Sequence, residues 1–349
     1  MKSNKLHVAP TKTIIIFWGN FGGGVRLSNN LLTLAESHSL DVYFSLSRNS
    51  EGWRENFTTL QITSDFIVST PRNKLRTINI ISGFIQSLRI LLKVRKHKIN
   101  QVVMLMPHPW DFIFETMAHL FGMRVLRCIH DAEPHSGDKL LPNWYIKLLA
   151  RISTANIFFS NSVAEKFQHL QKESILLNLF DLPIENDYSR KENLVLFIGR
   201  IKKYKGLGLL AEAWRIIGET ELKLKVCGSG KGIPEFLETH ATVVNRWLAD
   251  DEVTKLIGQA KVLVLPYLEA SQSGLIPIAE NLGTNIVITP IAGLIEQLSS
   301  NTSHVISRNF TGLALAEAIN IAIQLPNIKS NNSNNVGIEM LQAFMRKPS

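Results

Sequence analysis

Short apolar runs, many of them β-branched, alternate along the whole chain with longer segments whose apolar positions recur every three or four residues. The short runs are typical of buried strands, and the longer segments are typical of amphipathic helices. In the first half we expect strands at residues 13–18, 40–46, 65–68, 101–106, 124–130 and 155–160. Helices are expected between them, most clearly at residues 75–96, 111–121 and 139–152.

The same alternation restarts after a polar, turn-prone stretch at residues 181–192, where we place a domain boundary. Beyond it we expect strands at residues 194–198, 222–227, 241–244, 261–265, 285–289 and 304–306, again separated by helices. A Ser/Asn-rich stretch between residues 326 and 335 is expected to be a flexible connector before a last helix at residues 337–345. The predicted domains are therefore 1–180 and 193–325, followed by 326–349.

This alternation predicts an α/β protein with two parallel sheets covered by helices. A length of 349 residues fits two domains, and 45% hydrophobic with 19% charged residues is a globular composition. Parallel α/β sheets bind ligands where the carboxyl ends of strands lead into helices. Candidate chemistry is therefore expected in the loops that follow the predicted strands.

The net charge of +9 favours anionic partners such as nucleotide diphosphates, anionic lipids or nucleic acid, without choosing among them. Cys128 and Cys227 each lie in an apolar run that reads as a buried strand, which predicts free thiols in a reducing compartment. The sequence shows neither a secretory segment nor an apolar run of transmembrane length. We expect a protein that is soluble or lies on a membrane surface without crossing it.

The loop FIGRIKKYKG, at residues 197–206, brings Arg200 and Lys205 to the carboxyl end of a strand just before a helix. Two cations at such a place suit a diphosphate, since arginine binds phosphate oxygens in a planar fork and lysine as a point charge. A solvated basic loop is the alternative.

A second loop, PYLEASQSGLIPIAENLG at residues 266–283, also follows an apolar strand and opens a helix. The small residues at 271–274 allow backbone N–H groups to approach an anion, and the helix dipole favours negative charge there. Glu269 and Glu280 can accept hydrogen bonds from sugar or ribose hydroxyls. The alternatives are a plain helix cap and solvent-facing glutamates.

Three ordered motifs, GRIKKYKG, PYLEASQSG and TPIAGLIEQL, together resemble the donor-binding domain of the bacterial family 4 glycosyltransferases, the group 1 glycosyl transferases. The resemblance covers roughly residues 193–298. VCGSGKG at residues 226–232 is similar to the family's glycine turn near the nucleotide, and VVNRWLADDEV at residues 243–253 is similar to its base-side loop.

The resemblance implies a GT-B fold, in which two Rossmann-like domains face each other across a donor cleft. It also implies roles for individual side chains. The donor diphosphate is assigned to Arg200, Lys205, Ser271, Gln272, Ser273, Gly274 and Leu275, the donor sugar or ribose to Glu269 and Glu280, and the nucleotide side to Gly228, Val244 and Arg246. The family usually carries two glutamates around this helix, whereas here Gln272 lies eight positions before Glu280.

Two loops of the first half complete the expected site. Gly22, Gly23 and Gly24 follow the first strand and let backbone approach a bound group, and Arg26 adds a positive charge, which the resemblance places on the acceptor side. The spacing of these glycines is not the GxGxxG pattern of a dinucleotide-binding site.

The other loop, CIHDAEPHSGD at residues 128–138, carries His130, Asp131, Glu133 and His135. A histidine or carboxylate here can take the proton of an acceptor hydroxyl or orient the sugar. His130 and Asp131 are the expected catalytic pair. Metal binding is a weaker alternative, because no cysteine or spaced histidine pair completes a ligand set.

The segment 75–98, with Lys74 just before it, combines basic and large apolar residues in a helical pattern. The basic residues are Lys74, Arg76, Arg89, Lys93, Arg95, Lys96 and Lys98, and they lie beside Ile80, Ile81, Phe84, Ile85, Leu88, Ile90, Leu91 and Leu92. A basic amphipathic helix can lie on an anionic membrane, which would bring the protein to lipid-linked acceptors. The alternative is that its apolar face belongs to the domain core and its charges face solvent.

These features predict a cytoplasmic glycosyltransferase of cell-surface polysaccharide biosynthesis that can lie on the inner face of the cell membrane, and the resemblance implies that it retains the configuration of the sugar. We expect a nucleotide-sugar donor, a glycan or lipid-linked acceptor, and neither cofactor nor essential metal, because Arg200 and Lys205 replace the cation. The alternatives are a nucleotide-sugar epimerase or hydrolase, and a non-catalytic nucleotide-sugar-binding protein. Nucleic-acid binding is not expected, since no aromatic and basic recognition motif accompanies the charge.

Overall fold

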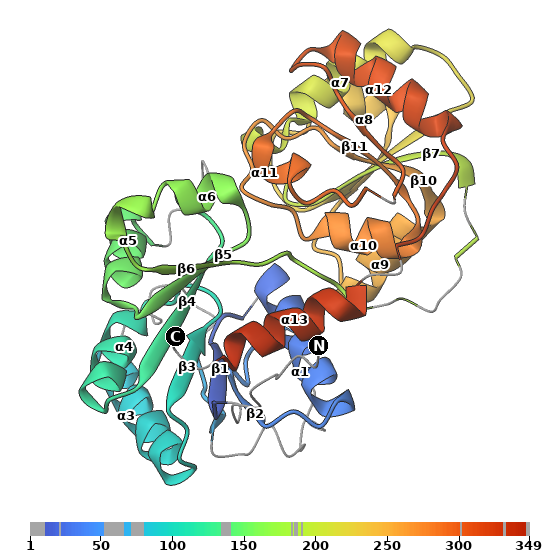
Figure 1. Cartoon of the computed structure of the whole chain (residues 1–349). Helices are drawn as coiled ribbons and strands as arrows, with labels where there is room; N and C mark the ends of the chain where they lie inside the picture. Colours follow the sequence, from blue (N-terminus) through green and yellow to red (C-terminus); the bar gives the residue numbers. More distant parts are fainter. Residues whose placement is uncertain are drawn as a thin grey trace.

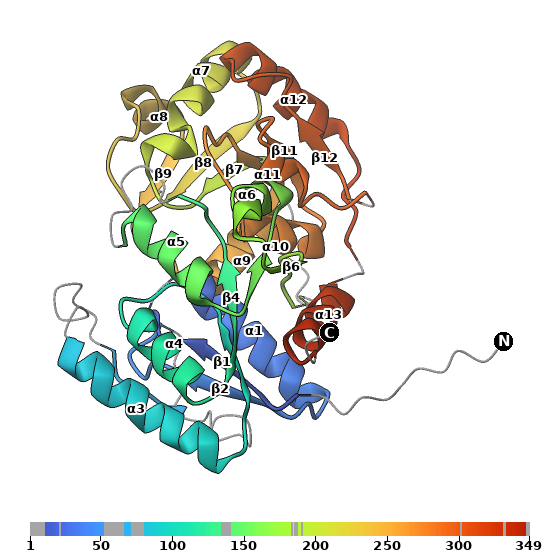
Figure 2. The same cartoon turned by 60° about the vertical axis from the view of Figure 1, so that its left-hand side comes forward.

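The computed structural model describes residues 11–20, 22–51, 66–70, 80–133, 141–182, 184, 188–189, 191–300, 302–330 and 333–346. The chain forms two α/β units, one from each half of the sequence (Figures 1 and 2). In the described part of the chain each unit contains a sheet of six strands, and every strand pairing in both sheets is parallel. The expectation of two parallel sheets is confirmed.

The N-terminal sheet has the strand order β2-β1-β3-β4-β5-β6. Its strands are β1 (Thr13–Phe17), β2 (Val42–Leu46), β3 (Gln101–Met104), β4 (Arg124–Ile129), β5 (Ala155–Phe158) and β6 (Glu173–Leu176). The described helices are α1 (Gly23–Ser37), α3 (Ile80–Lys96), α4 (Asp111–Leu120), α5 (Asn143–Ile152), α6 (Asn161–Glu165) and the 3-10 turn η2 (Gln168–Leu170). The order reverses between β1 and β3, so the loops after these strands diverge and leave room for a ligand.

The C-terminal sheet has the strand order β12-β11-β10-β7-β8-β9. Its strands are β7 (Lys191–Ile198), β8 (Lys223–Gly228), β9 (Thr242–Asn245), β10 (Ala260–Leu265), β11 (Asn285–Ile288) and β12 (His304–Ile306). Its helices are η3 (Lys203–Lys205), α7 (Leu207–Ile217), α8 (Glu235–His240), α9 (Asp250–Gln259), α10 (Leu275–Leu282), α11 (Ala292–Ile295) and α12 (Gly312–Gln324). Here the order reverses between β7 and β10.

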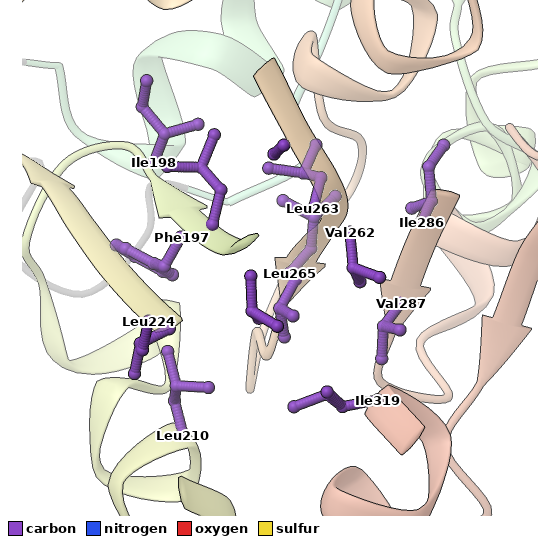
Figure 3. Packing of buried hydrophobic residues seen from close by; sticks show 14 of the residues in the cluster. Phe197, Ile198, Leu210, Leu224, Val262, Leu263, Leu265, Ile286, Val287 and Ile319 are labelled. Carbon is purple, nitrogen blue, oxygen red and sulfur yellow. The ribbon is translucent and has the colours of Figure 1, made fainter. Parts of the chain in front are cut away.

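Both sheets are buried on both faces, which explains why their strands read as continuous apolar runs. In the C-terminal unit, side chains of β7, β8, β10 and β11 pack against helices that include α7 and α12 (Figure 3). In the N-terminal unit, one face of the sheet packs against α1 and a C-terminal helix, α13 (Ser333–Phe344), and the other face packs against α3 and α4. Among the described helices, none is long and apolar enough to cross a bilayer.

The expected strands agree with the observed ones to within three residues, with two exceptions. The expected strand at 65–68 is wrong for its described residues, which form only a single bridge between Val68 and Ser47; Asp65 lies outside the described residues. Strand β6 was not expected, because ESIL is a short edge strand whose residues are mostly exposed and carry little apolar signal. The helices expected from residues 75 and 139 begin, in their described parts, at Ile80 and Asn143.

Helix α13 returns to the N-terminal unit and lies beside α1 (Figure 1). Leu341 and Phe344 are fully buried in the core that α13 shares with α1 and the sheet. The backbone carbonyl of Phe344 also accepts hydrogen bonds from the side chains of Thr13 and Gln101. The described part of the connector, residues 326–330, is held to the C-terminal unit by Asn327, which bonds Lys261 and Asn285. The chain therefore crosses between the two units twice.

A buried charge cluster lies between β4 and α4. Arg127 donates to Asp111 at 2.9 Å and forms an ion pair with Glu115, and all three side chains are at most 1% exposed. Ser153 donates to the other oxygen of Glu115 at 2.8 Å. Burial raises the pKa of Asp111 to about 6, although the charge of Arg127 opposes the shift. Because burial disfavours the charged carboxylate, Asp111 keeps its proton to a higher pH than in the unfolded chain.

We expect Asp111→Asn to remove part of the pH dependence of stability. Because the folded pKa of Asp111 is raised, its stabilising effect is present below the ordinary value of 3.8 and is lost as the pH rises to about 6. The loss is on the order of 3 kcal/mol, and the Asp111→Asn variant should not show it. Urea unfolding across this pH range measures the difference. Asp41→Asn, which changes an exposed aspartate paired with Lys12, is the control and should keep the native profile. If the free energy of unfolding changed equally with pH in Asp111→Asn and in the native protein, the expectation would be contradicted.

Candidate active site

A cavity of about 380 Å³ lies between the two units, at the carboxyl ends of both sheets. It is lined by loops that follow β1 and β4 in the first unit and β7, β8, β9 and β10 in the second. Both points at which the strand order reverses open into it. Of the residues expected at the site, those that line the cavity are Gly22, Gly23, Gly24, Arg26, His130, Asp131, Arg200, Lys205, Gly228, Arg246, Gln272, Ser273, Gly274 and Leu275.

The two expected phosphate-binding cations are each held by a buried tyrosine. Arg200 donates to the hydroxyl of Tyr204 at 2.9 Å, and the ammonium of Lys205 lies 3.5 Å from the ring centroid of Tyr267. A cation over an aromatic face is attracted by the ring, so Tyr267 fixes where the lysine charge sits. Burial raises the pKa of Tyr267 to about 12, although the hydrogen bond with Ser273 and the charge of Arg200 lower it. Both tyrosines lie within the motifs of the resemblance, but they were not among the expected site residues.

Two glycines let the backbones at this edge come unusually close. Gly206 has a φ of +72°, and a Cβ atom there would lie 1.7 Å from the carbonyl oxygen of Pro266. Gly228 has a φ of +142°, and a Cβ atom there would lie 1.7 Å from the carbonyl oxygen of Gly199. Any side chain at these positions would push apart the loops that carry the cations.

The loop before α10 is supported by α11, which belongs to the third motif of the resemblance. A Cβ atom on Gly293 would lie 2.3 Å from the carbonyl oxygen of Ser271, so α11 packs directly against this backbone. The side-chain oxygen of Gln297 accepts a hydrogen bond from the backbone N–H of Ser273 at 2.6 Å. This N–H is therefore already paired, and Ser271 does not line the cavity. The N–H of Leu275 also donates, to the hydroxyl oxygen of Ser273 at 3.4 Å, so the expected anion contact is left to Gly274 at the start of α10.

The glutamates expected at the sugar or ribose are placed elsewhere. Glu280 is 7% exposed, and its carboxylate accepts hydrogen bonds from the backbone and side chain of Ser299 and from Thr302. Glu269 is exposed, and neither glutamate lines the cavity, nor does Val244 of β9. The carboxylate of Glu280 holds the loop after α11, and the assignment of the two glutamates to the sugar or ribose stays a prediction.

Arg26 connects the two units instead of facing the cavity as an isolated charge. Its guanidinium donates to both oxygens of Asp181, at 3.0 and 2.5 Å, and to the hydroxyl of Thr254 on α9 at 3.2 Å. Asp181 also accepts from Asn30 at 2.6 Å, and its carbonyl accepts from Asn281 of α10. Burial lowers the pKa of Arg26, but the hydrogen bond and charge of Asp181 outweigh it and raise the pKa above its usual value.

The base-side loop presents Arg246 and Trp247 to the cavity. Arg246 is held by Glu252 through two hydrogen bonds of 2.9 and 2.6 Å, and these lower the pKa of Glu252 to about 2. The indole N–H of Trp247 donates to Glu51 of the N-terminal unit. The loop therefore contributes a fixed guanidinium plane and a second contact between the units.

His130 and Asp131 follow β4 and line the cavity opposite the cations. The imidazole of His130 lies 3.0 Å from the carbonyl oxygen of Leu105 and 2.6 Å from the side-chain nitrogen of Gln272. Glu133 is exposed and lies 4.0 Å from Lys166, and His135 lies outside the described residues. Among the described residues, no group of three His, Cys, Asp or Glu side chains is arranged to hold a metal ion. Cys128 and Cys227 are free and buried.

Comparison with known proteins agrees with this geometry. Residues 192–324 match the model of the family described as glycosyl transferases group 1. No curated protein matches the chain. HepE of Anabaena, in complex with UDP and glucose, is 12% identical with a TM-score of 0.65, and the match covers 96% of this chain and 95% of that one.

Two further solved structures show the same arrangement. A glycosyltransferase from Rickettsia africae is 14% identical with a TM-score of 0.66, covering 97% of this chain and 100% of that one. WaaG, a glycosyltransferase involved in lipopolysaccharide biosynthesis, is 15% identical with a TM-score of 0.63, covering 96% of this chain and 100% of that one.

The fold is therefore GT-B, as expected. The family model matches the second half of the chain, residues 192–324, and the solved structures show the GT-B fold for the chain as a whole.

We expect Arg200→Ala and Lys205→Ala each to weaken the binding of a nucleoside diphosphate. Each change removes a cation from the partly desolvated end of the cavity, at a cost of roughly 1.5–3 kcal/mol per charge-assisted hydrogen bond. Isothermal titration calorimetry with UDP and GDP measures this loss. Lys203→Ala is the matched control, because Lys203 is an exposed cation of the same loop and does not line the cavity. Unchanged affinity in both cavity variants would remove the two cations from the site.

Proposed function

We propose that the protein transfers a sugar, with retention, from a nucleotide diphosphate sugar to a glycan or lipid-linked acceptor in cell-surface polysaccharide biosynthesis. The observation that carries the proposal is the convergence of Arg200, Lys205 and the N-terminus of α10 on one side of a cavity whose other side presents Asp131. Cations and a helix N-terminus suit a diphosphate, and a carboxylate on the facing domain suits an acceptor hydroxyl.

The charge on the leaving diphosphate is the main electrostatic demand of such a transfer. Arg200 and Lys205 are held by Tyr204 and Tyr267, so they need little reorganisation when that charge develops. We therefore assign the leaving-group role to these cations and no role to a metal or cofactor. Departure of the diphosphate and attack on the same sugar face would depend on positioning in the cavity.

A donor screen tests the proposal. A ligand that binds the native state raises its melting temperature, so thermal shift over UDP, GDP, ADP and CMP sugars identifies the donor. Transfer of radiolabelled sugar to acceptor extracts then tests the reaction. Donor consumption without any acceptor would indicate an epimerase or hydrolase, and binding without consumption would indicate a non-catalytic protein.

We expect Asp131→Asn to lower turnover by about 100-fold or more, the usual scale for proton transfer or equivalent positioning. Donor affinity should change little, because the diphosphate cations belong to the other domain. Glu133→Gln makes the same chemical change two residues along the loop, at an exposed side chain that does not line the cavity. It should keep native turnover, and full turnover in Asp131→Asn would remove Asp131 from the catalytic machinery.

We also propose that α3 places the protein on the cytoplasmic face of a membrane. The exposed surface of this helix is apolar along its first turns, where Ile81 is 73% and Phe84 50% exposed, and basic in its last turn, with Lys93, Arg95 and Lys96. Of its apolar side chains, Ile90, Leu91 and Val94 are buried in the core. The alternative that the whole apolar face belongs to the core therefore accounts for only part of the helix. An exposed apolar strip followed by cations along one helix fits an anionic lipid surface.

Vesicle sedimentation tests the membrane proposal. Binding should rise with the fraction of anionic lipid, fall with added salt, and weaken when Lys93, Arg95 and Lys96 become Gln, since each cation contributes about 1 kcal/mol. Phe84→Ser should weaken binding at every salt concentration. Changing the exposed C-terminal-domain cations Lys203, Lys223 and Lys231 to Gln is the control. If the fraction of protein that sediments with vesicles changed neither with lipid charge nor in Phe84→Ser, the proposal would be contradicted.

A further inference from the structure

His130 and Gln272 form a hydrogen bond across the cavity, from the end of β4 in one unit to the loop before α10 in the other. The two residues are 142 positions apart in the chain. His130 is only 8% exposed, and its ring stacks on Phe159 with the ring centroids 4.4 Å apart. The imidazole is therefore held in position from three sides, by β3, β5 and the facing domain.

The two partners of the imidazole determine which nitrogen carries the proton. The carbonyl oxygen of Leu105 lies 3.0 Å from Nε2 and can only accept, so Nε2 carries a hydrogen. The side-chain nitrogen of Gln272 lies 2.6 Å from Nδ1 and can only donate, so Nδ1 presents its lone pair. A second proton on Nδ1 would face an N–H group. The geometry is thus that of a neutral imidazole with the Nε2–H tautomer.

The surroundings of the ring favour the same state. Burial lowers the pKa of His130, while Asp131 and the hydrogen bond to Leu105 oppose the shift. Among the described residues, Asp131 is the charged group that acts on the imidazole. The groups in contact with the ring are neutral: Leu105 just after β3, Phe159 just after β5, and Gln272 of the facing loop. The side-chain oxygen of Gln272 is buried and finds no partner among the described residues. This oxygen is a neutral acceptor next to the cavity.

We propose that Gln272 is a positioning residue whose amide fixes His130 as the neutral Nε2–H tautomer. His130 then serves the site as an oriented, uncharged group, and neither ring nitrogen is available to take the proton of an acceptor hydroxyl while the bond to Gln272 is made. A carboxylate at position 272 would instead accept from Nδ1–H and favour the imidazolium. The identity of residue 272 therefore sets the charge on His130. The effect of Gln272 on sugar transfer rests on the proposed function, whereas the assignment of the His130 tautomer does not.

Nitrogen NMR of the histidine rings tests the assignment without any substrate. In protein labelled with ¹⁵N-histidine, the signal lost in His130→Gln identifies His130. We expect one protonated and one unprotonated nitrogen, unchanged between about pH 5 and pH 8. In Gln272→Glu the same ring should titrate within this range with a raised pKa. Gln272→Met, which removes the donor without adding a charge, should shift the titration less than the glutamate variant does.

Kinetics then distinguish a positioning role from a merely structural one. With the donor found by the screen, kcat of Gln272→Glu should acquire an ionisation that follows the NMR titration of His130 and that the native profile lacks. A native His130 that titrates freely in this range, or carries its proton on Nδ1, would overturn the proposal, as would a Gln272→Glu ring that does not change. A His130 that behaves as expected in a protein that transfers no sugar would instead refute the proposed function alone.

Discussion

The ion pair between Arg26 and Asp181 is the interaction on which the cavity depends. It joins the first helix of the N-terminal unit to the segment by which the chain enters the second unit, and its guanidinium also reaches Thr254 on α9. Asp181 is 3% exposed, so its charge needs this partner. Removing one member of a buried pair is far more costly than the pair is stabilising, because the remaining charge is left uncompensated. The contact therefore constrains how the two sheets face each other.

Parallel topology then explains why chemistry gathers in the space that this contact defines. All carboxyl ends of a parallel sheet lie at one edge, and a reversal of strand order separates two neighbouring loops there. Both sheets direct this edge toward the cavity. Gly206 and Gly228 let the loops of the second unit approach within distances that no other residue permits, so Arg200 and Lys205 stand close to the start of α10. The same two glycines therefore account for the close backbone contacts and for the gathering of positive charge at the site.

Much of the site could be predicted from motifs, because a motif records which residue types follow a strand. Arg200, Lys205, His130 and Asp131 were found in this way and line one cavity. The supporting tyrosines, 204 and 267, were missed, although they stand inside the same motifs; an aromatic residue beside a lone cation was the available signal. Glu280 was assigned to the ligand because a carboxylate near a helix start is ambiguous from sequence. Only the structure shows Ser299 and Thr302 already bonded to it.

The sequence by itself determined the alternation of strands and helices, the point where it restarts, and the placing of candidate side chains after particular strands. These are local properties, because apolar periodicity and turn chemistry act over a few residues. The tertiary structure alone decided the return of α13 to the first unit, the exposure of the apolar strip on α3, and the bond between His130 and Gln272. Each of these depends on which surfaces of the folded chain meet and which stay uncovered, and no local pattern encodes that outcome.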